Sequence, residues 1–284
     1  MKVLLTSGMK VLLKVRGIAH QRSSVVLKQW ETRNIPCICW FSSSSIPTTP
    51  TYGNAKNFQN RIAIVDEHGE HTYDQILKFS GHLARLIQNT LEKGVSQQRV
   101  AFLCPNDVSY VITQWATWIA GHVAVPLYPK HPTSQLEYYV RDSESSIIVT
   151  TSTLAQKIKP ILSGHHVIVL EDYFFKNSTS ASDILGDVES LDADETGGKY
   201  NEDFNLVSDA MIVYTSGTTG PPKGVVLTHK NIQSQISCLH RAWGWTSGDT
   251  ILHCLPLHHV HGIVNALLCP LYVGARYSIS YNFY

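Results

Sequence analysis

The sequence predicts an α/β fold in which a mostly parallel sheet is flanked by helices. From Arg61 onward, short apolar runs alternate with segments of about ten to fifteen residues whose apolar positions follow helical spacing. Runs such as VAFLC and SIIVTT are continuously apolar or β-branched, as in strands that are covered on both faces. Alternation of this kind implies βαβ units and hence a parallel arrangement of most strands.

The first expected elements are a hairpin, a helix, a strand and a second helix. Residues 61–73 form two short runs with a turn at His68 and Gly69. The helix predicted over 72–91 has apolar residues at positions 76, 79, 83, 86, 87 and 91. A buried strand is expected over 99–105. The next helix, 106–121, begins at Asn106 or Asp107 as its N-cap and ends at Gly121.

The alternation continues to residue 275. The remaining strands are expected over 122–128, 146–151, 165–171, 209–215, 224–229 and 250–256. The remaining helices are expected over 133–143, 153–162, 230–243 and 261–275. The segment of about 177–205 is rich in Ser, Asp, Glu and Gly, which is typical of an exposed loop.

Composition narrows the class of protein. The 284 residues are 43% hydrophobic and 10% aromatic, which is normal for a folded chain of one large or two ordinary domains. A formal net charge of +1 gives no electrostatic basis for binding a nucleic-acid backbone. No apolar run reaches the roughly 18 residues of a membrane-spanning helix. Most of the six cysteines lie in apolar runs and none forms a CxxC pair, which favours a reducing compartment.

Residues 1–45 differ from the rest of the chain. They contain seven lysines and arginines, a single acidic residue, Glu31, and a serine run at 42–45. This is the composition of a mitochondrial transit peptide, and it implies the mitochondrial matrix as the compartment. A basic leader without a function is the alternative. In either case we expect residues 1–45 to be disordered and the fold to span 46–276.

The stretch YTSGTTGPPKG, Tyr214–Gly224, is a candidate polyphosphate-binding loop between two predicted strands. Its closely spaced N–H and hydroxyl groups can form an anion-binding nest, and its glycines let the backbone approach a ligand. Lys223 adds a compact positive charge suited to phosphate. The spacing fits neither the Walker A nor the dinucleotide motif. The other loop residues are Thr215, Ser216, Gly217, Thr218, Thr219, Gly220, Pro221 and Pro222.

The longer stretch YTSGTTGPPKGVVLTH resembles the phosphate-loop signature of the adenylate-forming (AMP-binding) enzymes. This superfamily includes acyl-CoA synthetases, luciferases and the adenylation domains of peptide synthetases. The resemblance extends from about Arg61 to Arg276 and includes LPLHHVHGIVNALLCPLYVGA. It implies the N-terminal portion of the family's large domain. Within the family, the phrases PLYPKHPTSQLEY and ILHCLPLHHVHGIVNALLCPL are most similar to malonyl-CoA synthetases.

The resemblance implies an ATP-dependent acid–thiol ligation. A carboxylate attacks the α-phosphorus of Mg²⁺-bound ATP to give an acyl-adenylate and pyrophosphate, and the thiol of coenzyme A then displaces AMP. It assigns the loop from Thr215 to Pro222 to the β and γ phosphates and Lys223 to the pyrophosphate. The expected partner is a small carboxylate, malonate or methylmalonate, in mitochondrial fatty acid metabolism. Another acyl-CoA ligase of the family, or a non-catalytic ATP-binding isoform, is the alternative.

A histidine cluster follows, in which PLHHVHG places His258, His259 and His261 within four residues. The resemblance assigns His259 to a position beside the carboxylate being adenylated, and His261 to the acyl pocket. A protonated His261 would favour a substrate with a second carboxylate, which is the reason for preferring malonate. A metal site, or a polar helix start without a role, is the alternative. No acidic residue lies nearby in the sequence to complete a metal site.

The likeness is expected to end after VGA, which leaves 277–284 as a divergent tail. The family's second ATP motif, its ribose-binding aspartate, its hinge and its small C-terminal domain have no counterpart in the 284 residues. We therefore expect a truncated chain with exposed strand edges and apolar faces, poorly soluble and inactive alone. The side chains expected to be exposed are Trp243, Trp245, Leu267, Leu268 and Tyr272.

Overall fold

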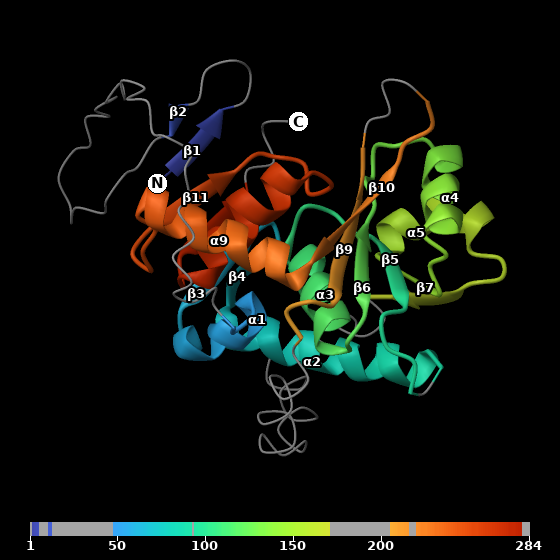
Figure 1. Cartoon of the computed structure of the whole chain (residues 1–284), viewed down its shortest axis with the longest axis horizontal. Coiled ribbons are helices and arrows are strands. Elements are labelled where there is room, and N and C mark those ends of the chain that lie inside the picture. The colour runs from blue at the N-terminus through green and yellow to red at the C-terminus, as the bar shows by residue number, and fades with distance from the viewer. Residues whose placement is uncertain are drawn as a thin grey trace.

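Two six-stranded sheets organise the chain in the computed structural model, which describes residues 2–5, 11–12, 48–92, 94–170, 205–215 and 220–279 (Figure 1). The strand orders are β2-β1-β11-β12-β3-β4 and β10-β9-β6-β5-β7-β8. The first sheet contains β1 (Lys2–Leu5), β2 (Val11–Leu12), β3 (Ile62–Asp66), β4 (Gly69–Thr72), β11 (Thr250–His253) and β12 (Arg276–Ile279). The second contains β5 (Arg99–Leu103), β6 (Val123–Pro126), β7 (Ile147–Thr150), β8 (His166–Val169), β9 (Asp209–Tyr214) and β10 (Gly224–Thr228).

Most neighbouring strands are parallel, as predicted. In the first sheet, β1, β11, β12 and β3 are parallel, and β3 turns back into antiparallel β4. The turn lies at Glu67 and His68, one residue earlier than expected, because Asp66 pairs with Gly69. In the second sheet only the pair β9–β10 is antiparallel. The predicted α/β class is therefore confirmed, with the strands divided between two sheets.

The three longest helices of the described residues begin where the sequence provides a side-chain cap. The α-helices are α1 (Thr51–Asn54), α2 (Tyr73–Thr90), α3 (Val108–Ile119), α4 (Thr133–Asp142), α5 (Ser152–Ile158), α9 (His229–Trp243) and α10 (Cys269–Tyr272). Two 3₁₀ turns, Ala55–Phe58 and Lys159–Ile161, and a π-helix, His261–Leu268, complete them. Thr72 and Thr228 form capping boxes with the residue three positions on, and Asp107 caps α3.

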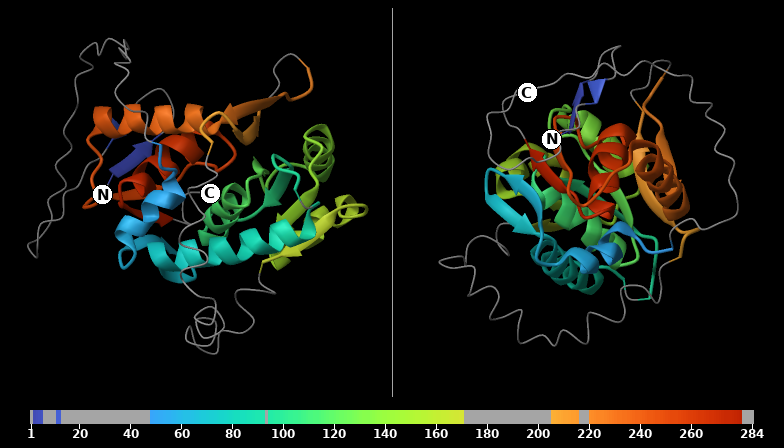
Figure 2. Two further views of the ribbon diagram at one scale, coloured as in Figure 1. Left: turned by 60° about the horizontal axis from the view of Figure 1, so that its bottom comes forward. Right: turned by 90° about the vertical axis from the view of Figure 1, so that its left-hand side faces the viewer.

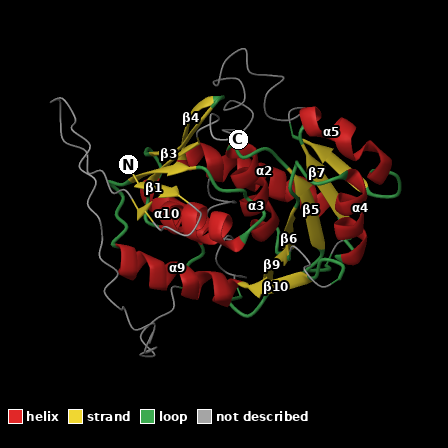
Figure 3. Ribbon diagram, turned by 90° about the horizontal axis from the view of Figure 1, so that it is seen from above, coloured by secondary structure: helices red, strands yellow, loops and turns green. Residues whose placement is uncertain are grey.

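The central strands of the second sheet, β5, β6 and β7, are buried on both faces. Val100 and Phe102 of β5 belong to a core cluster that also contains residues of the first sheet, such as Tyr277. Ala101 and Leu103 point the other way, into a cluster shared with α4 and α5. Helices α2 and α3 pack together against the first cluster, and α4 and α5 cover the opposite face (Figures 2 and 3). This three-layer arrangement explains why the strands are continuously apolar.

The structure corrects the prediction of exposed apolar side chains. Trp245, Leu267 and Leu268 are each at most 1% exposed, and Trp243 and Tyr272 are partly buried against the core. Helix α9 contacts the π-helix, which carries Leu267 and Leu268, and α10, which carries Tyr272. Among the described residues, the large apolar side chains that are exposed are all valines, namely Val95, Val207, Val225, Val226 and Val260.

Both ends of the predicted domain also differ from expectation. The segment Arg276–Ile279 forms β12, which is inserted between β11 and β3, so the first part of the expected tail belongs to the sheet. Within the expected leader, β1 pairs with β11 and β2 pairs with β1, because short extended runs can add backbone hydrogen bonds at a sheet edge. The rest of the leader, and the predicted loop up to residue 204, lie outside the described residues. No helix among the described residues is both long and apolar enough to cross a membrane.

Candidate active site

The two ends of the predicted phosphate loop are joined as a hairpin. The Thr215 N–H donates to the Lys223 carbonyl at 3.0 Å, and the Lys223 N–H donates to the Thr215 Oγ1 at 3.2 Å. Gly220 has a φ of +152°, which a residue with a Cβ rarely adopts. Lys223 is exposed. Ser216, Gly217, Thr218 and Thr219 lie outside the described residues.

The residue after the lysine has a steric role. A Cβ on Gly224 would lie 2.9 Å from the Ile212 Cγ2 and 3.3 Å from the Tyr214 ring. Gly224 pairs directly with Tyr214, so the absence of a side chain lets β10 start close to β9. This close pairing fixes the base of the loop, which is formed by Thr215 and Lys223.

The histidine cluster lies in a tight turn between β11 and the π-helix. Ile263 N–H donates to the His259 carbonyl at 3.0 Å, which starts the helix. A Cβ on Gly262 would lie 2.3 Å from the Pro256 carbonyl oxygen, so only glycine fits the observed backbone there. The turn therefore presents His258 as half-buried and His259 as exposed.

His258 and His259 are neutral at pH 7. Burial, together with the nearby His259 and His131, lowers the pKa of His258 to about 3. Partial burial also lowers the pKa of His259. A neutral imidazole can donate one hydrogen bond to a carboxylate and accept another. His259 is therefore suited to orienting an acid rather than to pairing with it as a fixed cation.

His261 takes part in a polar chain at the first turn of the π-helix. The Gln235 Nε2 donates to the Asn265 Oδ1 at 3.3 Å, and the Asn265 Nδ2 lies 3.2 Å from the His261 Nδ1. A His261 ring that accepts at Nδ1 from the Asn265 NH₂ group carries its proton on Nε2 and is a neutral donor, whereas malonate was expected from the sequence on the basis of a protonated ring.

A row of rings in contact, two pairs stacked and two edge-on, connects the histidine turn to the phosphate loop. His258 stacks on Tyr128 with centroids 3.9 Å apart, and His131 lies 5.2 Å from His258. His131 is 5.7 Å from Tyr139, which stacks on Tyr214 at 4.1 Å. Tyr214 directly precedes the loop. Tyr128, His131 and Tyr139 were not predicted as site residues. Tyr128 and His131 lie within the phrase PLYPKHPTSQLEY, and Tyr139 directly follows it.

The location of this row agrees with the topology. Tyr128 follows β6, Thr215 follows β9, and the histidine turn follows β11. Each segment thus leaves the carboxyl end of a strand, which is where α/β sheets bind their ligands. The loop and the histidines, predicted separately from sequence, are joined here in one region through their ring contacts.

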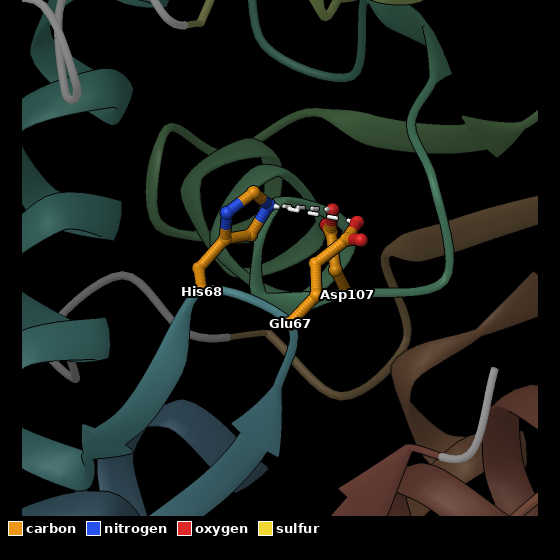
Figure 4. Close-up of side chains that lie close together, drawn as sticks. All are labelled: Glu67, His68 and Asp107. Carbon is orange, nitrogen blue, oxygen red and sulfur yellow. Dashed lines mark ion pairs between the residues drawn. The ribbon is translucent and has the colours of Figure 1, made fainter.

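A separate group of ligand-type side chains lies at the β3–β4 turn (Figure 4). Ligand atoms of Glu67, His68 and Asp107 lie within 4.8 Å of one another, and no other such group of three occurs among the described residues. His68 Nε2 is 3.5 Å from Asp107 Oδ2 and 3.9 Å from Glu67 Oε1. These three atoms could contact one divalent cation. Asp107, however, already caps α3 by accepting from the Ser109 N–H at 2.8 Å.

Beside this group, Asp66 at the end of β3 connects the β3–β4 turn to the start of α3. Its buried carboxylate accepts from the Val108 N–H and the His68 N–H, both at 2.9 Å, and lies 3.0 Å from His71 Nε2. Burial works against the charge, but these bonds together hold the pKa of Asp66 below its usual value. The turn of the first sheet is thereby fixed to the start of α3, and we interpret the cluster as structural.

The chain is similar to known proteins in both sequence and fold. The family described as AMP-binding enzyme matches residues 52–282, which extends past the predicted boundary at Arg276. The human mitochondrial malonate–CoA ligase ACSF3 is 43% identical over 235 residues, covering 80% of this chain and 38% of that protein. The malonate–CoA ligase of Arabidopsis thaliana is 35% identical over 236 residues, covering 78% of this chain and 38% of that protein.

Among solved structures, ATP-bound MatB from Rhodopseudomonas palustris matches with a TM-score of 0.62 and 26% identity. The match covers 81% of this chain and 45% of that one. The chain thus spans less than half the length of the relatives it matches. Because the family model matches most of its length, the chain belongs to the AMP-binding enzyme family.

Proposed function

We propose that this chain supplies the triphosphate-binding and acid-binding parts of an ATP-dependent acid–thiol ligase that activates malonate. The observation that supports the proposal is the row of ring contacts that leads from His259 to Tyr214, the residue before the Thr215–Lys223 hairpin. Adenylation requires an acid and a triphosphate to meet, and a protein achieves this mainly by positioning and charge neutralisation.

The hairpin is the proposed site for the β and γ phosphates. Its exposed lysine and its glycine at positive φ offer charge and backbone N–H groups without a carboxylate in the loop itself. Mg²⁺ prefers carboxylate and phosphate oxygens, so on this proposal it arrives with the nucleotide rather than on a ligand from the loop. Lys223 stabilises the negative charge that develops on the leaving pyrophosphate.

The histidine turn is the proposed site for the acid. His259 orients the reacting carboxylate through a neutral ring nitrogen, and His261 donates to the second carboxylate of malonate or methylmalonate from the first turn of the π-helix. The named activity of the human and Arabidopsis relatives supports malonate as the substrate. Coenzyme A is the proposed thiol acceptor.

A chimera tests the proposed reaction. Residues 52–279 of this chain would replace the matching segment of the human malonate–CoA ligase, and acid-dependent exchange of pyrophosphate into ATP would be measured with malonate, methylmalonate and octanoate. We expect exchange with malonate, lost in His259→Ala. Preference for octanoate would indicate another acyl-CoA ligase. ATP binding without exchange for any acid would indicate a nucleotide-binding protein without ligase activity.

His261 permits a sharper test of acid selectivity in the same chimera. His261→Phe keeps a ring at this position and removes the nitrogen donor. We expect the ratio of kcat/KM for malonate to that for octanoate to fall by about tenfold or more, since a site built to hydrogen-bond one group discriminates strongly against its absence. An unchanged ratio would remove His261 from the proposed acid site.

The compartment is also a proposal. The basic, serine-rich composition of residues 1–45 and the mitochondrial names of the vertebrate relatives support the mitochondrial matrix. Fusing residues 1–45 to a fluorescent protein should direct it to mitochondria. Diffuse fluorescence would contradict the assignment.

A further inference from the structure

Both ends of the phosphate loop are attached to one helix, α4. At the end of the loop, the Tyr138 hydroxyl donates to the Pro222 carbonyl at 2.9 Å. At its start, the Tyr214 hydroxyl donates to the Asp142 Oδ2 at 2.8 Å and lies 3.2 Å from the Tyr139 carbonyl oxygen. Pro222 directly precedes Lys223, and Tyr214 directly precedes Thr215.

The spacing of these contacts follows from helix geometry. Tyr138 and Asp142 are four residues apart, so they lie on the same face of α4 and are separated by about 6 Å along its axis. A single face of α4 therefore contacts both ends of the hairpin, through the Tyr138 and Asp142 side chains.

The loop needs such an attachment because β10 is exposed. It is the last strand of its sheet, and Val225 and Val226 are 44% and 49% exposed. Lys223 is also exposed, and its backbone is joined to Thr215 by the two hairpin bonds. The Tyr138 hydroxyl holds Pro222, the residue before the lysine, against α4. Helix α4 is itself anchored to the sheet, because the Tyr139 ring stacks on Tyr214.

We propose that Tyr138 and Asp142 form a two-point clamp on the phosphate loop, with Tyr138 as a positioning residue for Lys223. The clamp holds the loop ends in register, so that Lys223 is held at a fixed place relative to Thr215. Its consequence for ATP affinity rests on the proposed function; its effect on the loop itself does not.

Trypsin cleavage after Lys223 tests the clamp directly. Lys223 is exposed and is followed by glycine, so the Lys223–Gly224 bond is a substrate whenever the hairpin opens. In the 284-residue chain, Tyr138→Phe should speed this cleavage by roughly two- to tenfold, the effect of one net hydrogen bond. Tyr214→Phe should do the same from the other end of the loop.

Two controls separate a local effect from general loosening. Tyr110→Phe also removes a tyrosine hydroxyl, one that is buried in α3 without a hydrogen-bond partner among the described residues, and it should leave cleavage at Lys223 unchanged. Cleavage after Lys78, exposed on α2, should be equal in all variants. An unchanged rate at Lys223 in Tyr138→Phe, or an equal increase at Lys78, would overturn the clamp.

MgATP titration of the same variants, followed by equilibrium dialysis, tests the link to the nucleotide. We expect Tyr138→Phe to weaken MgATP binding by roughly two- to tenfold with an unchanged midpoint of urea unfolding. Faster cleavage with unchanged MgATP affinity would overturn the positioning role. Failure of the unsubstituted chain to bind MgATP would count against the proposed function, and the cleavage rates would then decide the clamp by themselves.

Discussion

Replacing Gly262 with alanine should destabilise the protein and disturb the histidine turn. A Cβ at this position would lie 2.3 Å from the Pro256 carbonyl oxygen and 3.1 Å from its carbonyl carbon. Both are backbone atoms, so no side-chain rotation relieves the overlap, and the turn that carries His258 and His259 must shift. Forcing an extra carbon into a packed site costs about 1–3 kcal/mol.

A second glycine isolates the free-energy cost of the steric overlap from the effect of alanine on the unfolded chain. In Gly248→Ala the nearest atom to the new Cβ is the Thr246 Oγ1 at 3.8 Å, an ordinary contact. Both substitutions restrict the unfolded chain by a similar amount, about 0.4–1 kcal/mol in favour of folding, so this contribution cancels in the comparison. Urea unfolding followed by circular dichroism should show Gly262→Ala less stable than Gly248→Ala by about 1–3 kcal/mol. Equal stabilities would refute the reasoning, because they would mean that the turn has room for a Cβ.

Two further predictions concern buried polar groups. Burial lowers the pKa of His253 to about 4, so the folded state stays neutral while the unfolded chain gains a proton below about pH 6.5. Stability should therefore fall as the pH drops from 6.5 to 4. In urea titrations at pH 7 and 4.5, His253→Gln should lose less stability between the two pH values than the unsubstituted chain. An equal loss in both proteins would contradict the prediction. Asp66→Ala leaves the Val108 and His68 N–H groups without their acceptor and should cost about 3–5 kcal/mol in urea unfolding. Asp74→Ala is the control, because it breaks the exposed ion pair with Lys78, and it should cost less than about 1 kcal/mol. Similar losses of stability in both variants would show that the Asp66 contacts add nothing.

Local sequence signals predicted the elements well. The helix expected over 230–243 is observed as His229–Trp243, because Thr228 and Asn231 form a capping box and Gly244 adopts a φ of +58° at its end. Asp107 caps α3, one of the two residues expected, for the same reason. Such signals depend on residues within one turn of each other, so they can be read without knowing the fold.

Non-local pairing could not be predicted in the same way. β12 is inserted between β11 and β3, although more than 200 residues separate β12 from β3 in the sequence. The division into two sheets depends on such contacts. Burial of Trp245 and Leu267 likewise depends on how α9 packs over the π-helix, and the expectation that they are exposed was wrong for that reason.

The candidate site shows the same division. The glycine- and threonine-rich loop and the three histidines carry their chemistry in adjacent residues, so short stretches of sequence, and their resemblance to a known family, singled them out. Tyr138 and Tyr139 lie about 80 residues before the loop, and only the crossover from β6 through α4 to β7 brings them to it. Nothing in their immediate sequence marks them as neighbours of a phosphate site.

Binding of MgATP by the Lys223→Met variant tests the central claim most directly. Lys230→Met is the matched control, because Lys230 is also exposed and lies seven residues further on, in the first turn of α9. We predict saturable binding by the unsubstituted chain and by Lys230→Met, at least about tenfold weaker binding by Lys223→Met, and equal urea midpoints for all three, as expected for surface substitutions. Equal MgATP affinity in the two variants would contradict a role for this hairpin in holding a triphosphate.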